Sequence, residues 1–144
     1  EFITYRLLFE FNRVAVIDAP LYAYYMNSHG ITKSQWSRRR LDKLVALRQQ
    51  IDWFRDNGFE RALKKQTYNL AVNLGTQIQG MIETGYAPRK IYMLRKELRA
   101  VLWSNRRDAE FRKKDNAYLY EIAYPKVSWF YWTICGIISR FIRK

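Results

Sequence analysis

The spacing of apolar residues predicts helices over most of the chain, beginning near the N-terminus. The first helix is expected to end near Asn12, and its apolar side carries Phe2, Tyr5, Leu8 and Phe9. Arg6 and Glu10 fall on the opposite side of the same helix. This pattern is typical of an amphipathic helix that buries one face.

The period then changes over residues 14–30. Residues 14–17 form a short apolar run rich in β-branched side chains, residues 18–20 contain a proline turn, and residues 21–26 are strongly aromatic. We therefore expect a strand, a turn and a second strand. Residues 27–30 form a polar loop, in which Gly30 allows a sharp change of direction.

Two further helices are predicted after this loop. From Ser34 onward we expect a helix that ends at Asn57 and Gly58, with an apolar stripe of Leu41, Leu44, Leu47, Ile51 and Phe54. The next helix runs to Gly85 with a stripe of Leu63, Leu70, Leu74, Ile78 and Met81.

The remainder of the chain also has helical spacing. Pro88 is expected in the first turn of a helix that buries Ile91, Leu94, Leu98 and Val101. Residues 106–114 are a charged connector, residues 116–123 a short helix, and Pro125 opens a last helix over 127–144. The predicted fold class is mainly α: a helical bundle with a short N-terminal helix and a two-strand element, that is, an α+β fragment.

The composition is that of a folded, strongly basic domain. A chain of 144 residues with 49% hydrophobic residues fits one compact unit. It carries 26 Lys and Arg against 13 Asp and Glu, a net charge of +13. This charge attracts phosphates, anionic lipid or nucleic acid and does not by itself choose among them.

Several catalytic and metal chemistries lack the residues they need. The sequence holds a single histidine, His29, and a single cysteine, Cys135, so an intrachain disulfide is impossible and a Cys/His nucleophile pair would require these two to meet. Two such ligands cannot complete a tetrahedral zinc site. Neither G-x-x-x-x-G-K nor G-x-G-x-x-G occurs.

The run LYAYYMNSHGITKS at residues 21–34 is the most specific stretch. It resembles a segment of bacterial family 2 glycosyltransferases, in which an aromatic strand leads into a polar loop. Residues 1–8, the strand at 14–18 and Pro20 fit the same pattern, so the resemblance covers about the first 35 residues. At Tyr25 and Asn27 many relatives carry Arg. Lys33 with residues 38–40 are either candidates to supply that charge here or the solvated basic start of a helix.

The resemblance implies a sugar transfer from a nucleotide-sugar to a glycan or lipid-linked acceptor. In that family a Glu-Asp pair precedes the first helix, so this chain is expected to be the C-terminal part of a larger enzyme and inactive when isolated. No catalytic residue, metal ligand or cofactor site is assigned to it, and a divalent metal, Mg²⁺ or Mn²⁺, is expected in the full enzyme. The substrate-binding residues implied by the resemblance are Tyr24, Asn27, His29, Thr32 and Lys33.

The C-terminal segment has a separate character. Residues 127–139 carry no charge, and the cationic end consists of Arg140, Arg143 and Lys144. The run is too short to span a bilayer, but it suits a helix at the lipid headgroup boundary, or one buried in the core or in a homodimer interface. The apolar residues proposed for the membrane or interface contact are Trp129, Phe130, Trp132, Ile134, Ile138 and Phe141.

Three parts are therefore predicted. Residues 1–35 would be the end of a nucleotide-sugar transferase α/β domain, 36–124 a helical C-terminal domain, and 125–144 an amphipathic aromatic and basic helix. The predicted role is membrane-associated, cell-surface polysaccharide synthesis at the cytoplasmic face, with this region supplying the acceptor-side wall, membrane association or oligomerisation. The alternative is a non-enzymatic basic module that binds nucleic acid or oligomerises. Nucleic acid is not the expected partner, because the basic residues are spread through every helix.

Overall fold

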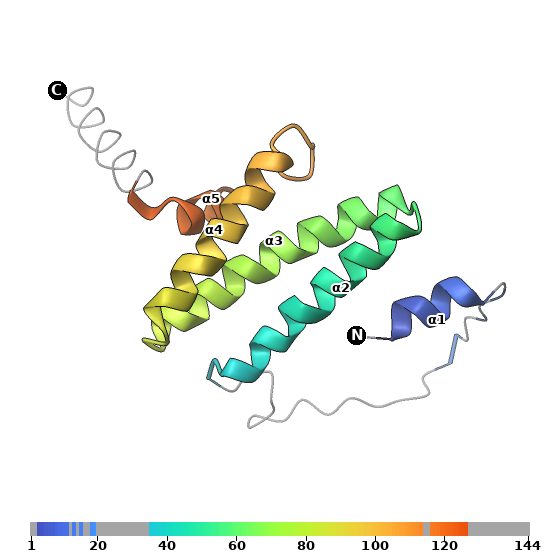
Figure 1. The fold of residues 1–144 in the computed structure, drawn as a ribbon, viewed down its shortest axis with the longest axis horizontal. Helices are drawn as coiled ribbons and strands as arrows, with labels where there is room; N and C mark the ends of the chain where they lie inside the picture. The colour runs from blue at the N-terminus through green and yellow to red at the C-terminus, as the bar shows by residue number, and fades with distance from the viewer. Residues whose placement is uncertain are drawn as a thin grey trace.

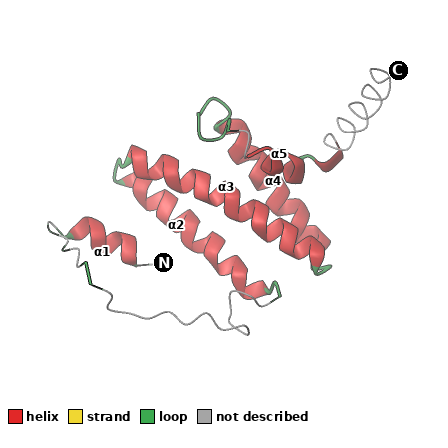
Figure 2. Cartoon of the chain, turned by 180° about the vertical axis from the view of Figure 1, so that it is seen from behind, coloured by secondary structure: helices red, strands yellow, loops and turns green. Residues whose placement is uncertain are grey.

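The computed structural model describes residues 3–11, 13, 15, 18–19, 35–113 and 116–126, and it confirms a mainly α fold (Figures 1 and 2). The elements are α1 Thr4–Glu10, a 3₁₀ turn η2 Arg38–Leu41, α2 Asp42–Asp56, α3 Glu60–Glu83, α4 Pro88–Ser104 and α5 Ala117–Ala123.

The predicted two-strand element is not supported. The described residues contain no β-strand, and the two segments at 14–17 and 21–26 lie almost entirely outside them. The prediction rested on β-branched and aromatic composition. Such composition reflects packing on a sheet surface more than an intrinsic backbone preference, so it is weak evidence without a sheet partner.

The helix expected from Ser34 begins later. Residues 35–37 are not helical, and Ser37 is extended with φ −139° and ψ 157° before the 3₁₀ turn starts at Arg38. Three consecutive arginines occupy that turn, and positive charge is unfavourable at a helix N-terminus. The regular α-helix starts at Asp42, whose carboxylate has the favourable sign for that position.

The ends of α2 and α3 and the start of α4 lie close to the positions predicted from the sequence. Asn57 follows the last residue of α2, and its side-chain amide donates to the carbonyl oxygen of Trp53 at 2.8 Å. Gly58 and Gly85 have φ values of +71° and +66°, the left-handed conformation that glycine adopts without a Cβ penalty. Pro88 occupies the first turn of α4, as expected.

Helix α3 is the centre of the fold, because α2, α4 and α5 all contact it (Figures 1 and 2). Leu74, Ile78 and Met81 of α3 have no exposed surface. The predicted stripe of α4 is confirmed at Leu94 and Leu98, which are buried, whereas the flanking positions predicted with them are half-buried.

The connection from α4 to α5 is anchored by a buried aromatic side chain, which the charged sequence around it does not predict. Phe111 lies within the predicted charged connector, yet it is 2% exposed and its ring meets that of Tyr68 edge-on, with centroids 5.5 Å apart. The Tyr68 hydroxyl donates to the side-chain oxygen of buried Asn116 at 2.7 Å. These contacts tie the connector to α3 just before α5 begins.

Helix α1 lies beside the end of α2 through aromatic contacts (Figure 1). Tyr5 is buried, as predicted, and its ring centroid is 5.3 Å from that of Trp53. Phe9 packs against Phe59 with a centroid separation of 4.4 Å. Leu8, expected on the buried side, is instead 53% exposed, because the aromatic cluster contacts a narrower part of this short helix.

The burial pattern yields a stability prediction within α4. We expect Leu98→Ala to lower the free energy of unfolding by about 2–5 kcal/mol, because it removes a fully buried side chain and leaves a cavity. The matched control is Met93→Ala in the same helix, where the side chain is 66% exposed and the cost should stay within about 0.5 kcal/mol. Urea unfolding measures both, and equal effects would contradict the assignment of the α4 core face.

Candidate functional site

The substrate-binding residues predicted from the resemblance lie outside the described residues, so the structure neither brings them together nor separates them. They are Tyr24, Asn27, His29, Thr32 and Lys33. The same holds for the predicted membrane or interface residues between Trp129 and Lys144. The described chain resumes at Gln35, two positions after Lys33. The contacts made there fix where the predicted loop joins the bundle.

Trp36 anchors this junction to α3. Its indole N–H donates to the side-chain oxygen of Gln77 at 2.8 Å, and Gln77 is 5% exposed. The Trp36 ring also packs on Tyr86 with centroids 5.0 Å apart. A buried amide is stable only with a partner, so this hydrogen bond both positions the indole and satisfies Gln77.

A glycine in α3 makes room for this anchor. A Cβ built on Gly80 would lie 2.7 Å from Cγ of Trp36 and closer still to Cδ1, and real Cβ atoms do not come so close to other atoms. Glycine in a helix interior costs about 1 kcal/mol relative to alanine. Glycine at position 80 therefore lowers the intrinsic stability of the helix, but it allows the indole to lie directly against the α3 backbone.

A groove of about 440 Å³ opens beside Trp36, and we call it the Trp36 groove. It is lined by Gln35, Trp36, Arg40, Thr76, Gln79, Gly80, Glu83, Thr84 and Tyr118. The lining offers aromatic faces together with amide, hydroxyl, carboxylate and guanidinium groups, which donate and accept hydrogen bonds. Such a mixture is suited to a ligand with several hydroxyl groups.

The polar groups of the Trp36 groove are suited to binding. The Gln79 amide donates to the Glu83 carboxylate at 3.0 Å. Burial, and then the neighbouring Tyr68, raise the pKa of the Tyr118 phenol, which stays a neutral donor and acceptor at physiological pH. The two threonine hydroxyls of the lining donate to main-chain carbonyl oxygens, Thr76 to that of Val72 at 3.0 Å and Thr84 to that of Gly80 at 2.8 Å, so neither is paired with a side-chain base in the described residues.

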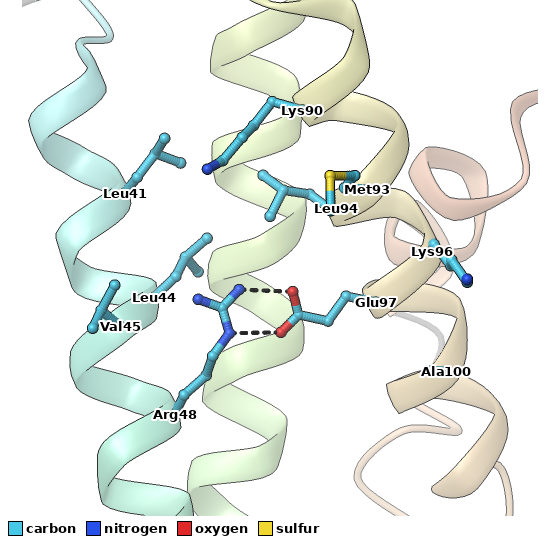
Figure 3. A pocket seen from close by; sticks show the side chains of 10 residues that line it. All are labelled: Leu41, Leu44, Val45, Arg48, Lys90, Met93, Leu94, Lys96, Glu97 and Ala100. Carbon is cyan, nitrogen blue, oxygen red and sulfur yellow. Dashed lines mark hydrogen bonds and ion pairs between the residues drawn. The ribbon is translucent and has the colours of Figure 1, made fainter.

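A second groove, of about 490 Å³, lies between α2 and α4 (Figure 3). An ion pair crosses it: Arg48 donates to both carboxylate oxygens of Glu97, at 2.8 and 2.7 Å. Hydrogen bonding to Glu97 raises the pKa of Arg48. The two charges satisfy one another, and aliphatic side chains such as Leu44 and Leu94 form much of the remaining lining. We interpret this groove as a structural junction of the two helices.

A third groove, of about 520 Å³, lies between α1 and the α2–α3 pair. Its polar lining is a chain of amides in which Asn69 donates to Gln66, and Gln66 donates to Gln50, each at 2.5 Å. Gln50 is buried, and the hydrogen bond satisfies its side-chain oxygen. The amides therefore serve mainly to join α2 to α3.

Sequence reasoning missed the Trp36 anchor. The helix predicted from Ser34 onward includes Trp36, and the apolar spacing of α3 gives Gly80 no special role. One signal was present, because an isolated glycine in a helical pattern often marks close packing. The identity of the packing partner, 44 residues away, could not be read from the sequence.

The described residues hold neither a cluster of metal ligands nor a membrane-spanning helix. In that part of the chain no group of three or more Asp, Glu, His or Cys side chains is placed to hold a metal ion. No helix there is both long and apolar enough to cross a bilayer. The expectation of Mg²⁺ or Mn²⁺ in the full enzyme stays a prediction.

A comparison with protein-family models found no match for this chain, and comparisons with curated proteins and with solved structures found none either.

The packing of Trp36 on Gly80 predicts that Gly80→Ala changes the free energy of unfolding in opposite directions with and without the indole. In the native background Gly80→Ala should lower the free energy of unfolding by about 1–3 kcal/mol, because the new Cβ collides with the indole. In a Trp36→Ala background the same change should raise it by up to about 1 kcal/mol, since the helix-propensity gain remains and the collision is gone. Urea unfolding of the four proteins measures this cycle.

Gly75→Ala is the matched control for this cycle. Its Cβ would meet Leu119 at 2.9 Å and does not contact Trp36. Its effect should therefore be the same in both backgrounds. If Gly80→Ala is equally stabilising with and without the indole, Trp36 does not pack as described.

Proposed function

We propose that this chain is the C-terminal region of a family 2 glycosyltransferase that transfers a sugar from a nucleotide-sugar to an acceptor in cell-surface polysaccharide synthesis. The observation that carries the proposal is the run at residues 21–34, which resembles the segment of that family leading into its active-site cleft. Trp36 lies two positions after this run in sequence and is anchored on α3. This contact supports the proposal, because it holds the chain that follows the predicted loop against the helical bundle.

The Trp36 groove supports the role of an acceptor-side wall. Gln35, the residue that follows the run 21–34 in sequence, is part of its lining, and the lining combines aromatic surface with groups that exchange hydrogen bonds with hydroxyls. Most of its lining residues are polar, unlike the mainly apolar lining common in small-molecule sites, and such a lining suits a ligand rich in hydroxyl groups. In this proposal Trp36 and Tyr118 offer faces to a sugar ring, while Gln79 and Glu83 bond its hydroxyl groups.

The proposal assigns the reacting groups to other parts of the enzyme. Sugar transfer from a nucleoside diphosphate needs the leaving diphosphate to be neutralised, which a divalent metal does well. We propose that Mg²⁺ or Mn²⁺, its acidic ligands and the general base belong to the nucleotide-sugar-binding domain. The helical region then holds the acceptor hydroxyl in position for attack, a contribution that comes from orientation.

The charge distribution favours this role over nucleic-acid binding. A protein that binds the phosphate backbone gathers its cations on one surface. Here Arg48 is paired with Glu97 between α2 and α4, Arg55 with Asp52 on α2, and Lys113 with Glu110 in the connector. The described cations are thus distributed over different elements.

The loop provides the first test, in a polypeptide that carries this sequence together with transferase activity. Asn27→Ala, His29→Ala and Lys33→Ala should each lower kcat/KM for sugar transfer about tenfold or more while the midpoint of urea unfolding changes little. Release of nucleoside diphosphate from a panel of nucleotide-sugars measures turnover. Lys64→Ala, an exposed change on α3, is the control. Unchanged kinetics in all three loop variants would remove the loop from the active site.

The Trp36 groove provides a second test that separates acceptor from donor. Gln79→Ala and Tyr118→Phe should raise KM for the acceptor several-fold and leave KM for the nucleotide-sugar unchanged, because the groove is proposed to contact the acceptor. Initial rates with each substrate varied in turn distinguish the two effects. A rise in the donor KM with an unchanged acceptor KM would contradict the acceptor-side assignment.

A further inference from the structure

A fourth groove, of about 780 Å³, lies where α4 meets the chain that leaves α5, and we call it the Arg95/Arg99 groove. Three basic residues line it: Arg95 and Arg99, one turn apart on α4, and Lys126. No acidic residue lines it within the described part of the chain. The groove of Figure 3 differs in holding an acid, because Glu97 lies opposite Arg48 there while Lys90 and Lys96 also line it.

Both guanidinium groups are held in position by the end of α5. Nε of Arg95 donates to the carbonyl oxygen of Ile122 at 3.0 Å, and Nε of Arg99 donates to that of Ala123 at 2.7 Å. Arg99 also lies over the ring of Tyr124, 5.1 Å from its centroid. A guanidinium carries four more N–H donors on its two Nη atoms, and these suit the oxygens of a phosphate.

The two arginines are close enough to repel one another. Burial, followed by the charge of Arg99, lowers the pKa of Arg95. Neither residue forms an ion pair with a carboxylate in the described ranges. Capping of the α5 carbonyls explains the Nε contacts, because cations are favourable at a helix C-terminus. It does not account for Lys126 or for a cavity beside the pair. An anion in the groove would remove the repulsion.

The rest of the groove is apolar. Ile91 and Tyr92 of α4 contribute to its wall, and Tyr92 is 66% exposed. Lys126 is followed in sequence by the uncharged aromatic run of residues 127–139. A ligand that matches this surface carries a phosphate directly beside hydrocarbon. Aromatic and cationic side chains together are typical of the lipid headgroup boundary.

We propose that the Arg95/Arg99 groove binds the phosphate of an anionic phospholipid headgroup at a membrane surface. The two guanidinium groups contact the phosphate oxygens, Lys126 adds charge, and Tyr92 with Ile91 contacts the glycerol and the first acyl carbons. This site assigns a phosphate contact to α4, separate from the basic end of the chain. It does not depend on the proposed sugar transfer, because binding is measured without any nucleotide-sugar.

The test uses the full chain and vesicles of phosphatidylcholine with and without phosphatidylglycerol. Arg95→Gln/Arg99→Gln should lower partitioning onto the anionic vesicles at least tenfold in a co-sedimentation assay. The matched control, Arg61→Gln/Lys64→Gln, removes the same charge from exposed positions of α3 and should lower it less than threefold. Circular dichroism and thermal unfolding establish that each variant is folded.

A second set of variants avoids the α5 contacts. Lys126→Gln and Tyr92→Ala leave both Nε hydrogen bonds in place, and each should still lower partitioning onto anionic vesicles several-fold. Soluble dihexanoyl phosphatidylglycerol should displace the chain from vesicles, whereas inorganic phosphate at the same concentration should not. These results would identify a lipid phosphate as the ligand.

Three outcomes would overturn the proposal. Equal losses in the groove variant and the α3 control would mean that general charge drives binding. Loss of binding in Trp129→Ala/Trp132→Ala with none in the folded groove variants would assign it to residues 127–144. Displacement by inorganic phosphate as effective as that by the short-chain lipid would leave an ion site without lipid selectivity.

Discussion

The structure depends on one constraint, which is that α3 must be covered on several faces at once. Leu74, Ile78 and Met81 are fully buried, and burying each such side chain stabilises the fold by about 1.5–3 kcal/mol. On other faces Gly75 and Gly80 lie against Leu119 and Trp36. A helix with apolar contacts around its circumference is stable only when enclosed. The two hairpins that α3 forms with α2 and α4, and the placement of α5, follow from this requirement.

Charged side chains join the elements at the edges of this core. The Arg48–Glu97 pair connects α2 to α4, but the two side chains are 38% and 31% exposed, so solvent reduces its contribution to about 1 kcal/mol or less. The pair fixes the relative register of the helices more than it stabilises them. Arg95 and Arg99 hold the end of α5 through main-chain carbonyls instead. These backbone contacts use only the Nε atoms, so they orient the two guanidinium groups and leave the Nη atoms available to a ligand.

Periodicity predicted the helices well because each stripe is a local pattern. The boundaries at Gly58, Gly85 and Pro88 follow from backbone conformations that few other residues adopt.

The contacts between distant segments could not be predicted in this way. Phe111 is the one large apolar side chain of the charged connector, and its burial depends on Tyr68 of α3. The grooves are still harder to predict. Folding brings Trp36 next to the α3 residues around Gly80, and the sequence spacing of these residues does not indicate that they meet. The predicted loop residues lie outside the described chain, so that part of the site remains a prediction.

The hydrogen bond between Trp36 and Gln77 has a thermodynamic consequence. It links the residue that follows the predicted loop to the most buried helix of the bundle. A ligand that binds the chain only when Trp36 is seated must raise the melting temperature of the helices, by an amount set by RT ln(1 + [L]/Kd). The cooperative unfolding of α3 would then report occupancy of a site at the edge of the bundle. A thermal shift could therefore identify sugars or nucleotide-sugars that bind here before any acceptor is known.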